Sequence, residues 1–181
     1  MSATPTLDDA HEHFDLPIDD TPLSDLAERA DFDFMHFFLR DALANDQIGD
    51  SPHSHHRFAL IPYSHPNDAL DDQTFQLIAD AGYRPASLRA LLTLAIERPQ
   101  LQTEADVIAL GTLRTRRIFD GDGQPQPGET VWDQTRLDPS ICQWGVGLSR
   151  IDNRRALVPM ELFLDDLIGD PTYLLVVAPN H

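Results

Sequence analysis

Apolar positions between residues 22 and 44 recur at the three- to four-residue spacing of an amphipathic α-helix. Thr21 is a good N-cap, and Pro22 suits the first helical position, where its missing N–H costs nothing. The polar run 45–49 ends the pattern. The sequence therefore predicts one long helix over 22–44, with acidic residues opposite its apolar face. Its apolar positions are Leu23, Leu26, Ala27, Ala30, Phe34, Phe37, Phe38 and Leu43.

The next part of the chain predicts a strand and two shorter helices. The run RFALIPY at 57–63 is typical of a short apolar strand. A helical pattern then begins at an aspartate cap near residue 72 and ends at Gly82, which is a common stop signal. A second helical pattern lies between Pro85 and Pro99, with its leucines on one face.

From residue 105 onward, branched and aromatic residues become frequent and the pattern favours strands. The pair Asp152–Asn153 lies between two such runs and predicts a tight hairpin turn. Pro159 at one end and Gly169 at the other favour a short helix over 159–169. The run TYLLVVA, 172–178, predicts a buried strand.

These elements predict an α+β protein in which a helical N-terminal half (about three helices) packs on a mainly antiparallel C-terminal sheet. A chain of 181 residues with 41% apolar residues is enough for one domain, expected over 21–181. Residues 1–20 are acidic and interrupted by prolines, and we expect them to form an arm, ordered or flexible. No apolar run is long enough to cross a bilayer, and nothing in the first twenty residues is typical of a secretory signal. We expect a cytoplasmic protein that is not inserted in a membrane.

Charge is the most unusual property of the composition. Thirty acids and thirteen bases give a net charge of −17, and the first fifty residues alone carry −11. Every base is an arginine, so the chain is lysine-free. A GC-rich genome or a saline cytoplasm would explain this composition, and avoidance of lysine modification is an alternative. A surface of this charge repels nucleic acid and attracts basic proteins.

Histidines are concentrated between residues 53 and 65 and raise the possibility of a metal site. His53, His55 and His65 could converge on zinc or another divalent transition metal if the chain turns back after Pro62. No carboxylate or cysteine lies at ligand spacing beside them, and the surrounding residues are typical of a polar loop. We therefore expect no cofactor and keep a metal enzyme or metal-binding protein as an alternative.

Two other patterns suggest ligands. Residues 72–98 have the spacing of a helix-turn-helix DNA-binding regulator, but the net charge argues against nucleic acid. Arginines in the C-terminal half could form an anion-binding patch if their strands are neighbours, although pairing with surface aspartates is the favoured explanation. The patch would consist of Arg114, Arg116, Arg150 and Arg154.

No complete catalytic constellation is present, so on balance the sequence favours a non-enzymatic role. The leading hypothesis is an interaction protein whose acidic surface binds a basic protein, as immunity proteins, antitoxins and inhibitors do. We expect acids of the arm and the predicted long helix to attract the partner and aromatic residues to anchor it. The candidate contact residues are Asp31, Phe32, Asp33, Asp41 and Trp132.

Overall fold

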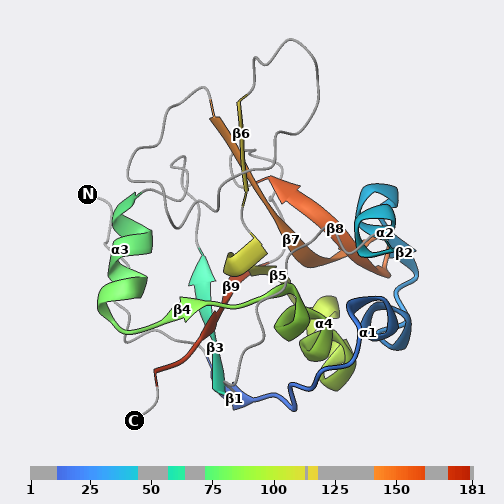
Figure 1. Ribbon diagram of the computed structural model, residues 1–181, viewed down its shortest axis with the longest axis horizontal. Coiled ribbons are helices and arrows are strands. Elements are labelled where there is room, and N and C mark those ends of the chain that lie inside the picture. Colours follow the sequence, from blue (N-terminus) through green and yellow to red (C-terminus); the bar gives the residue numbers. More distant parts are fainter. Residues whose placement is uncertain are drawn as a thin grey trace.

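A single mixed sheet is the centre of the protein in a computed structural model, which describes residues 12–44, 57–63, 72–112, 114–117, 141–161 and 171–179. The strand order is β1-β3-β9-β5-β7-β8-β2, with β4 also paired to β9 and β6 to β7 (Figure 1). The strands are β1 (Glu12–Asp15), β2 (Phe34–Met35), β3 (Arg57–Tyr63), β4 (Arg84–Pro85), β5 (Asp106–Ala109), β6 (Arg114–Arg117), β7 (Ile141–Ile151), β8 (Arg154–Glu161) and β9 (Thr172–Val177). The helices are α1 (Leu23–Arg29), α2 (Phe37–Ala44), α3 (Asp72–Asp80) and α4 (Leu88–Glu97), with the 3₁₀ turns η2 (Pro99–Thr103) and η3 (Leu110–Thr112).

This architecture shows that the predicted fold class is wrong. The N-terminal half is not a helical layer, because it contributes β1, β2, β3 and β4 to the same sheet as the later strands. Helices and strands alternate from β1 to α4. The sheet is also mixed, because β5 runs parallel to β9 and β2 runs parallel to β8.

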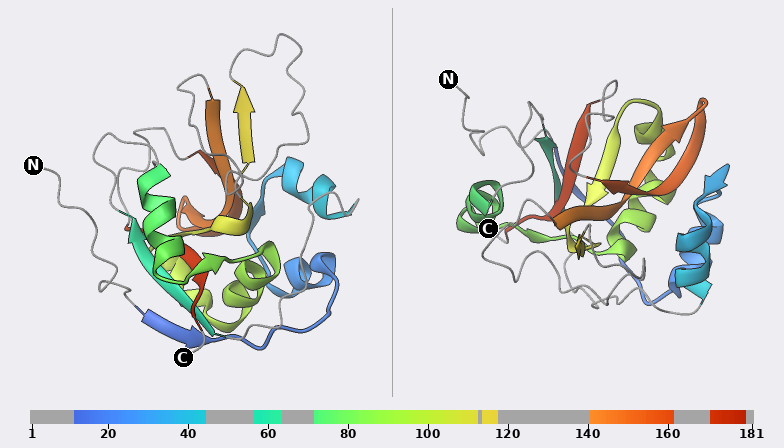
Figure 2. Two further views of the ribbon diagram at one scale, coloured as in Figure 1. Left: turned by 60° about the vertical axis from the view of Figure 1, so that its left-hand side comes forward. Right: turned by 90° about the horizontal axis from the view of Figure 1, so that it is seen from above.

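The two faces of the sheet bury two separate apolar cores. Along β3, Phe58 and Leu60 belong to the first core, whereas Ala59 and Ile61 belong to the second. This alternation follows from the two-residue period of a strand. Buried side chains of α1, α2 and α4 pack in the first core, and Ile78 of α3 packs in the second. The helices therefore cover both faces, as the views in Figure 2 show.

One of the inner strands of the sheet comes from the end of the described chain. β9 lies between β3, to which it is antiparallel, and β5, to which it is parallel. Its side chains Leu174, Leu175, Val176 and Val177 are at most 1% exposed. The buried strand predicted over 172–178 is thus confirmed, as are the strand β3 and the helices α3 and α4.

The hairpin that joins β7 to β8 confirms the predicted turn. Asp152 and Asn153 have φ values of 51° and 63°, the left-handed conformation that a type I′ turn needs at both positions. The short helix expected from Pro159 is wrong at its start, because β8 continues as a strand through Pro159 to Glu161. Pro159 is tolerated there because β2 pairs with β8 only at Ala156 and Leu157, so β8 has an edge at residue 159 among the described strands.

The long helix predicted over 22–44 is interrupted. α1 ends at Arg29, and Asp31 adopts a left-handed φ of 50°. Phe34 and Met35 then pair with β8, and the N–H of His36 donates to the carbonyl of Leu157 (3.1 Å) before α2 begins. The helical pattern is real on both sides, but sheet hydrogen bonds from a distant strand replace helical ones in the middle.

The helix-turn-helix arrangement predicted over 72–98 is not formed. The strand β4 lies between α3 and α4 and pairs with β9, so the two helices pack on opposite faces of the sheet. Arg84 lies in β4, and Ser87 caps α4 by accepting the N–H of Ala90. No helix among the described residues is long and apolar enough to cross a membrane.

Candidate interaction surface

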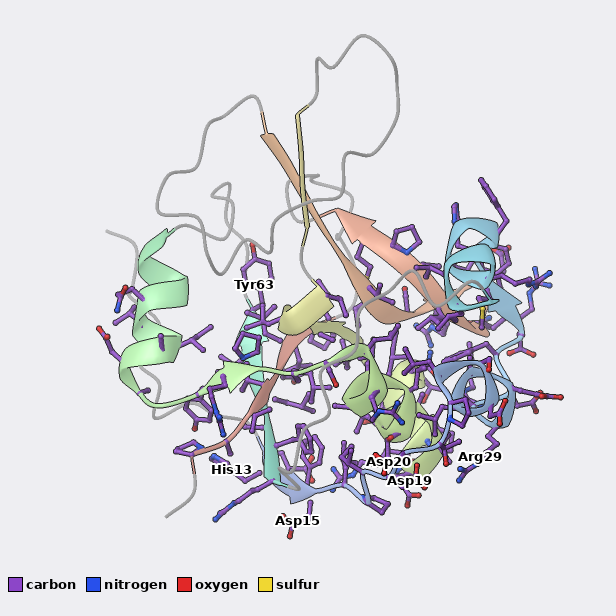
Figure 3. The ribbon with its side chains drawn as sticks, in the orientation of Figure 1. His13, Asp15, Asp19, Asp20, Arg29 and Tyr63 are labelled. Carbon is purple, nitrogen blue, oxygen red and sulfur yellow. The ribbon has the colours of Figure 1, made fainter. Side chains whose placement is uncertain are left out.

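Exposed acids line the N-terminal segment from β1 to β2. We call Glu12, Asp15, Asp19, Asp20, Asp25, Glu28, Asp31 and Asp33 the acidic surface, and all of these residues are exposed. The only base between residues 12 and 33 is Arg29. Figure 3 shows Asp15, Asp19 and Asp20 along one margin of the molecule, with Arg29 at its end. These acids therefore belong to one continuous stretch of the surface.

Contacts on both faces of the sheet hold β1 in place. Phe14 is buried and packs against Phe58 of β3, with ring centroids 6.4 Å apart. The Arg98 guanidinium lies 4.4 Å from the Phe14 ring centroid and forms an ion pair with Glu12 (2.5 Å). On the other face, His13 Nε2 lies 3.0 Å from the Tyr83 hydroxyl. The second half of the predicted arm is therefore an edge strand of the sheet.

The segment that leads from β1 to α1 is anchored by Arg89 of α4. Its guanidinium donates to the carbonyl of Asp19 (2.8 Å) and to that of Thr21. The N–H of Thr21 donates to the Asp19 carboxylate (3.0 Å). Hydrogen bonds from the Thr21 side chain and backbone lower the pKa of Asp19, with smaller contributions from the charges of Arg29 and Arg89. The Asp19 carboxylate therefore keeps its negative charge to lower pH than an ordinary aspartate.

Helix α1 is short but clearly amphipathic. Leu23, Leu26 and Ala27 are buried in the first core, whereas Asp25 and Glu28 are exposed. The buried side chains fix which face of the helix turns outward. As a result, Asp25 and Glu28 both lie on the solvent side of the helix.

The last two acids are organised by Arg155 of β8. The N–H of Arg155 donates to the Asp33 carboxylate (2.9 Å), and its guanidinium reaches the Asp31 carbonyl (3.5 Å). The same guanidinium lies 5.7 Å from the ring centroid of Phe32, which is half-buried. Two further hydrogen bonds go to the buried Gln102 (3.0 Å) and to the Ala95 carbonyl (2.9 Å). Asp31 and Asp33 are thus exposed as predicted, but Phe32 is partly covered.

Several acids of this surface have no cation to compensate them. In the part of the chain that the structure describes, Asp15, Asp20 and Glu28 form no ion pair with another residue. Asp25 accepts a hydrogen bond from Ser24 (3.2 Å), which carries no charge. The negative potential of the surface is therefore only partly neutralised within the molecule.

Two exposed phenylalanines lie directly beyond the acidic surface. Phe34 is 41% exposed and Phe37 is 71% exposed, although the sequence analysis assigned both to the apolar face of a long helix. The interruption of that helix is the reason, since it changes the direction in which every later side chain points. Phe37 contacts the ring of His36, with centroids 4.6 Å apart. Only the tertiary structure reveals this pair.

The sheet register gives the backbone positions of the four arginines of the predicted anion patch. In the register of the sheet, Arg114 is opposite Trp144 and Arg116 is opposite Cys142. Arg150 lies six residues further along β7, and a strand rises about 3.3 Å per residue, so about 20 Å separate the two pairs.

Arg150 and Arg154 also differ from each other in surroundings. The guanidinium of Arg150 donates to the Thr103 carbonyl (3.0 Å), and that of Arg154 lies 3.9 Å from the Asp152 carboxylate. In the sheet register, Arg150 is opposite Arg155, so Arg150 and Arg154 lie on opposite faces of the hairpin. The patch of four arginines stays a prediction, because the side chains of Arg114 and Arg116 lie outside the described residues.

The remaining predicted site residues lie outside the described residues. They are His53, His55 and His65 of the metal alternative, Trp132, and the side chain of Asp41. Among the residues that are described, no group of three histidines, cysteines or acids is arranged to hold a metal ion. The metal alternative therefore stays a prediction about the segments around residues 53 and 65.

Comparison with known proteins identifies no relative: no family model, no curated protein and no solved structure matches this chain.

Proposed function

We propose that this chain is a non-enzymatic interaction protein whose acidic surface binds a basic protein partner, in the manner of an immunity protein, antitoxin or inhibitor. The observation that carries the proposal is the exposure of all eight acids between Glu12 and Asp33, with Arg29 as the only base in that segment. The anchoring of this segment to the sheet by Arg89, Arg98 and Arg155 supports it further.

Pre-organisation makes this surface better suited to binding than a flexible acidic tail of equal charge. A tail loses conformational freedom when it binds, and that loss weakens the complex. Here β1 is already paired to β3, and the carboxylates of α1 are already turned outward. Fixed charges of one sign attract an oppositely charged protein and increase association rates by about 10- to 1,000-fold at low ionic strength.

The proposal is tested by neutralising acids of the surface that form no ion pair. The variant carries Asp15→Asn, Asp20→Asn, Asp25→Asn and Glu28→Gln. Partners captured by the wild-type protein are identified by mass spectrometry, and the association rate of each is then measured over a salt series. We expect a partner with a basic surface, and association with the variant that is at least about tenfold slower and depends less on salt.

A matched control removes the same number of charges elsewhere. Asp80→Asn, Glu97→Gln, Glu104→Gln and Asp152→Asn alter exposed acids outside the acidic surface. We expect this variant to associate at a rate close to that of the wild type. Equal slowing by both variants would mean that net charge alone matters, and a partner whose binding does not weaken with salt would contradict the proposal.

A further inference from the structure

The N-terminal segment twice combines a phenylalanine ring, a neighbouring acid and an arginine from a distant element. Arg98 stacks on Phe14 and pairs with Glu12, two residues earlier. Arg155 lies over Phe32, and its backbone N–H binds the carboxylate of Asp33, the next residue. The Arg98 guanidinium thus contacts the face of a ring and a carboxylate, and the Arg155 guanidinium lies over a ring and reaches the Asp31 carbonyl beside it. A planar guanidinium makes such paired contacts better than an ammonium group.

A third and a fourth ring in the same segment have no such arginine. Phe34 directly follows Asp33, and Phe37 lies three residues further on. Both rings are exposed, and within the described structure no guanidinium lies over either of them. Arg155 neighbours Ala156, which is opposite Phe34 in the sheet register, but its guanidinium is directed to Phe32, Gln102 and the Ala95 carbonyl instead.

We propose that Phe34 and Phe37 form an arginine-selective anchor for the basic partner. A partner arginine would stack on these rings while Asp33 and the rest of the acidic surface attract its other cations. This inference rests on the proposed function, and it adds the class of partner residue that the surface prefers: arginine rather than lysine. Charge complementarity selects this occupant, because the rings adjoin a segment with eight acids and one base.

The test uses two peptides of equal length, one of ten arginines and one of ten lysines, with the full chain. Affinities are measured by titration calorimetry at low ionic strength. Arginine pairs better with carboxylates in any acidic protein, so the decisive quantity is the change in the arginine-to-lysine affinity ratio on mutation. We expect Phe34→Leu combined with Phe37→Leu to lower this ratio by about two- to fivefold for each ring that stacks, and to leave lysine-peptide binding nearly unchanged.

Two controls separate stacking from apolar contact and from general charge. Ile151→Ala removes another exposed apolar side chain and should leave the ratio unchanged. Phe37→Trp should increase it, because indole binds cations more strongly than phenyl. Nuclear Overhauser contacts between the Phe37 ring and arginine side-chain protons of the peptide give an independent readout in the wild-type protein.

The outcomes distinguish this inference from the proposed function. If the leucine variant keeps the wild-type ratio, or no ring contacts appear, the anchor is refuted while an acidic docking surface stands. If neither peptide binds the wild-type protein, the acidic surface fails as a binding site and the anchor fails with it.

Discussion

Gln102 is the buried polar residue whose loss we expect to destabilise the protein most. It is 1% exposed and lies in η2, which follows α4 in the chain. Its side chain is directed toward the β7–β8 hairpin. Its Oε1 accepts from Arg155 Nε (3.0 Å), and its Nε2 donates to the carbonyls of Ala156 (3.1 Å) and Ser149 (3.4 Å). The Gln102 amide thus forms hydrogen bonds with one guanidinium and two backbone carbonyls. The guanidinium belongs to Arg155, which also contacts Asp31 and Asp33 of the acidic surface.

Gln102→Leu keeps the volume and removes all of these bonds. A hydrogen bond to a charged group contributes about 1.5–3 kcal/mol, and a neutral one contributes about 1 kcal/mol. Burial of the leucine offsets part of this loss, so we expect the free energy of unfolding to fall by about 2–4 kcal/mol. With a slope of about 2 kcal/mol per molar urea, the midpoint should fall by about 1–2 M.

Equilibrium urea unfolding, followed by intrinsic fluorescence, measures this change. Gln100→Leu in the same 3₁₀ turn is the matched control, because Gln100 is exposed and should change stability by less than about 0.5 kcal/mol. A double-mutant cycle with Arg155→Met isolates the contact between the two side chains, and we expect a coupling above about 0.5 kcal/mol. A loss below 0.5 kcal/mol for Gln102→Leu, or strict additivity in the cycle, would refute the reasoning.

Three further predictions concern the turn and two titrating groups. Asn153→Ala should cost about 1 kcal/mol in urea unfolding, because its φ of 63° is strained for alanine, whereas Asn153→Gly should be neutral within about 0.5 kcal/mol; equal effects would contradict this. Burial raises the pKa of the Tyr83 hydroxyl above 10.0. The free energy of unfolding of the wild type should therefore fall as the pH rises from the unfolded-state pKa through the folded-state pKa. The Tyr83→Phe variant should lose less stability over the same pH range in urea unfolding. Hydrogen bonds from Thr21 lower the pKa of Asp19. The stability that the Asp19 carboxylate contributes should therefore be present above the unfolded-state pKa and disappear as the pH falls through the folded-state pKa. Thr21→Val should raise the pKa of Asp19 in a carboxyl NMR titration, and an unchanged titration would exclude the side-chain bond.

Elements with a long, regular pattern were predictable from the sequence. The apolar run RFALIPY, the stop at Gly82 and the run TYLLVVA each correspond to an observed element boundary or strand. The turn at Asp152–Asn153 was predictable because few residues tolerate two consecutive left-handed conformations. In these cases the local preference of the chain and its tertiary contacts favour the same structure.

Short strands were not predictable, because their stability comes from partners far along the chain. β2 and β4 have two residues each, and they are strands only because β8 and β9 bind their backbones. β2 interrupts a pattern that locally favours one helix, and this interruption exposes Phe34 and Phe37.

By itself, the sequence determined the charge of this protein, its lack of lysine, the outward position of the acids between residues 12 and 33, and the identity of α3, α4, β3 and β9. Charged side chains stay in water whatever the topology, so their exposure needs no knowledge of the fold. Only the tertiary structure decided that β9 lies between β3 and β5, that the acidic segment is an anchored edge of the sheet, and that two phenylalanines remain exposed beside it. Those features depend on hydrogen bonds and apolar contacts between residues distant in sequence, which leave no local pattern.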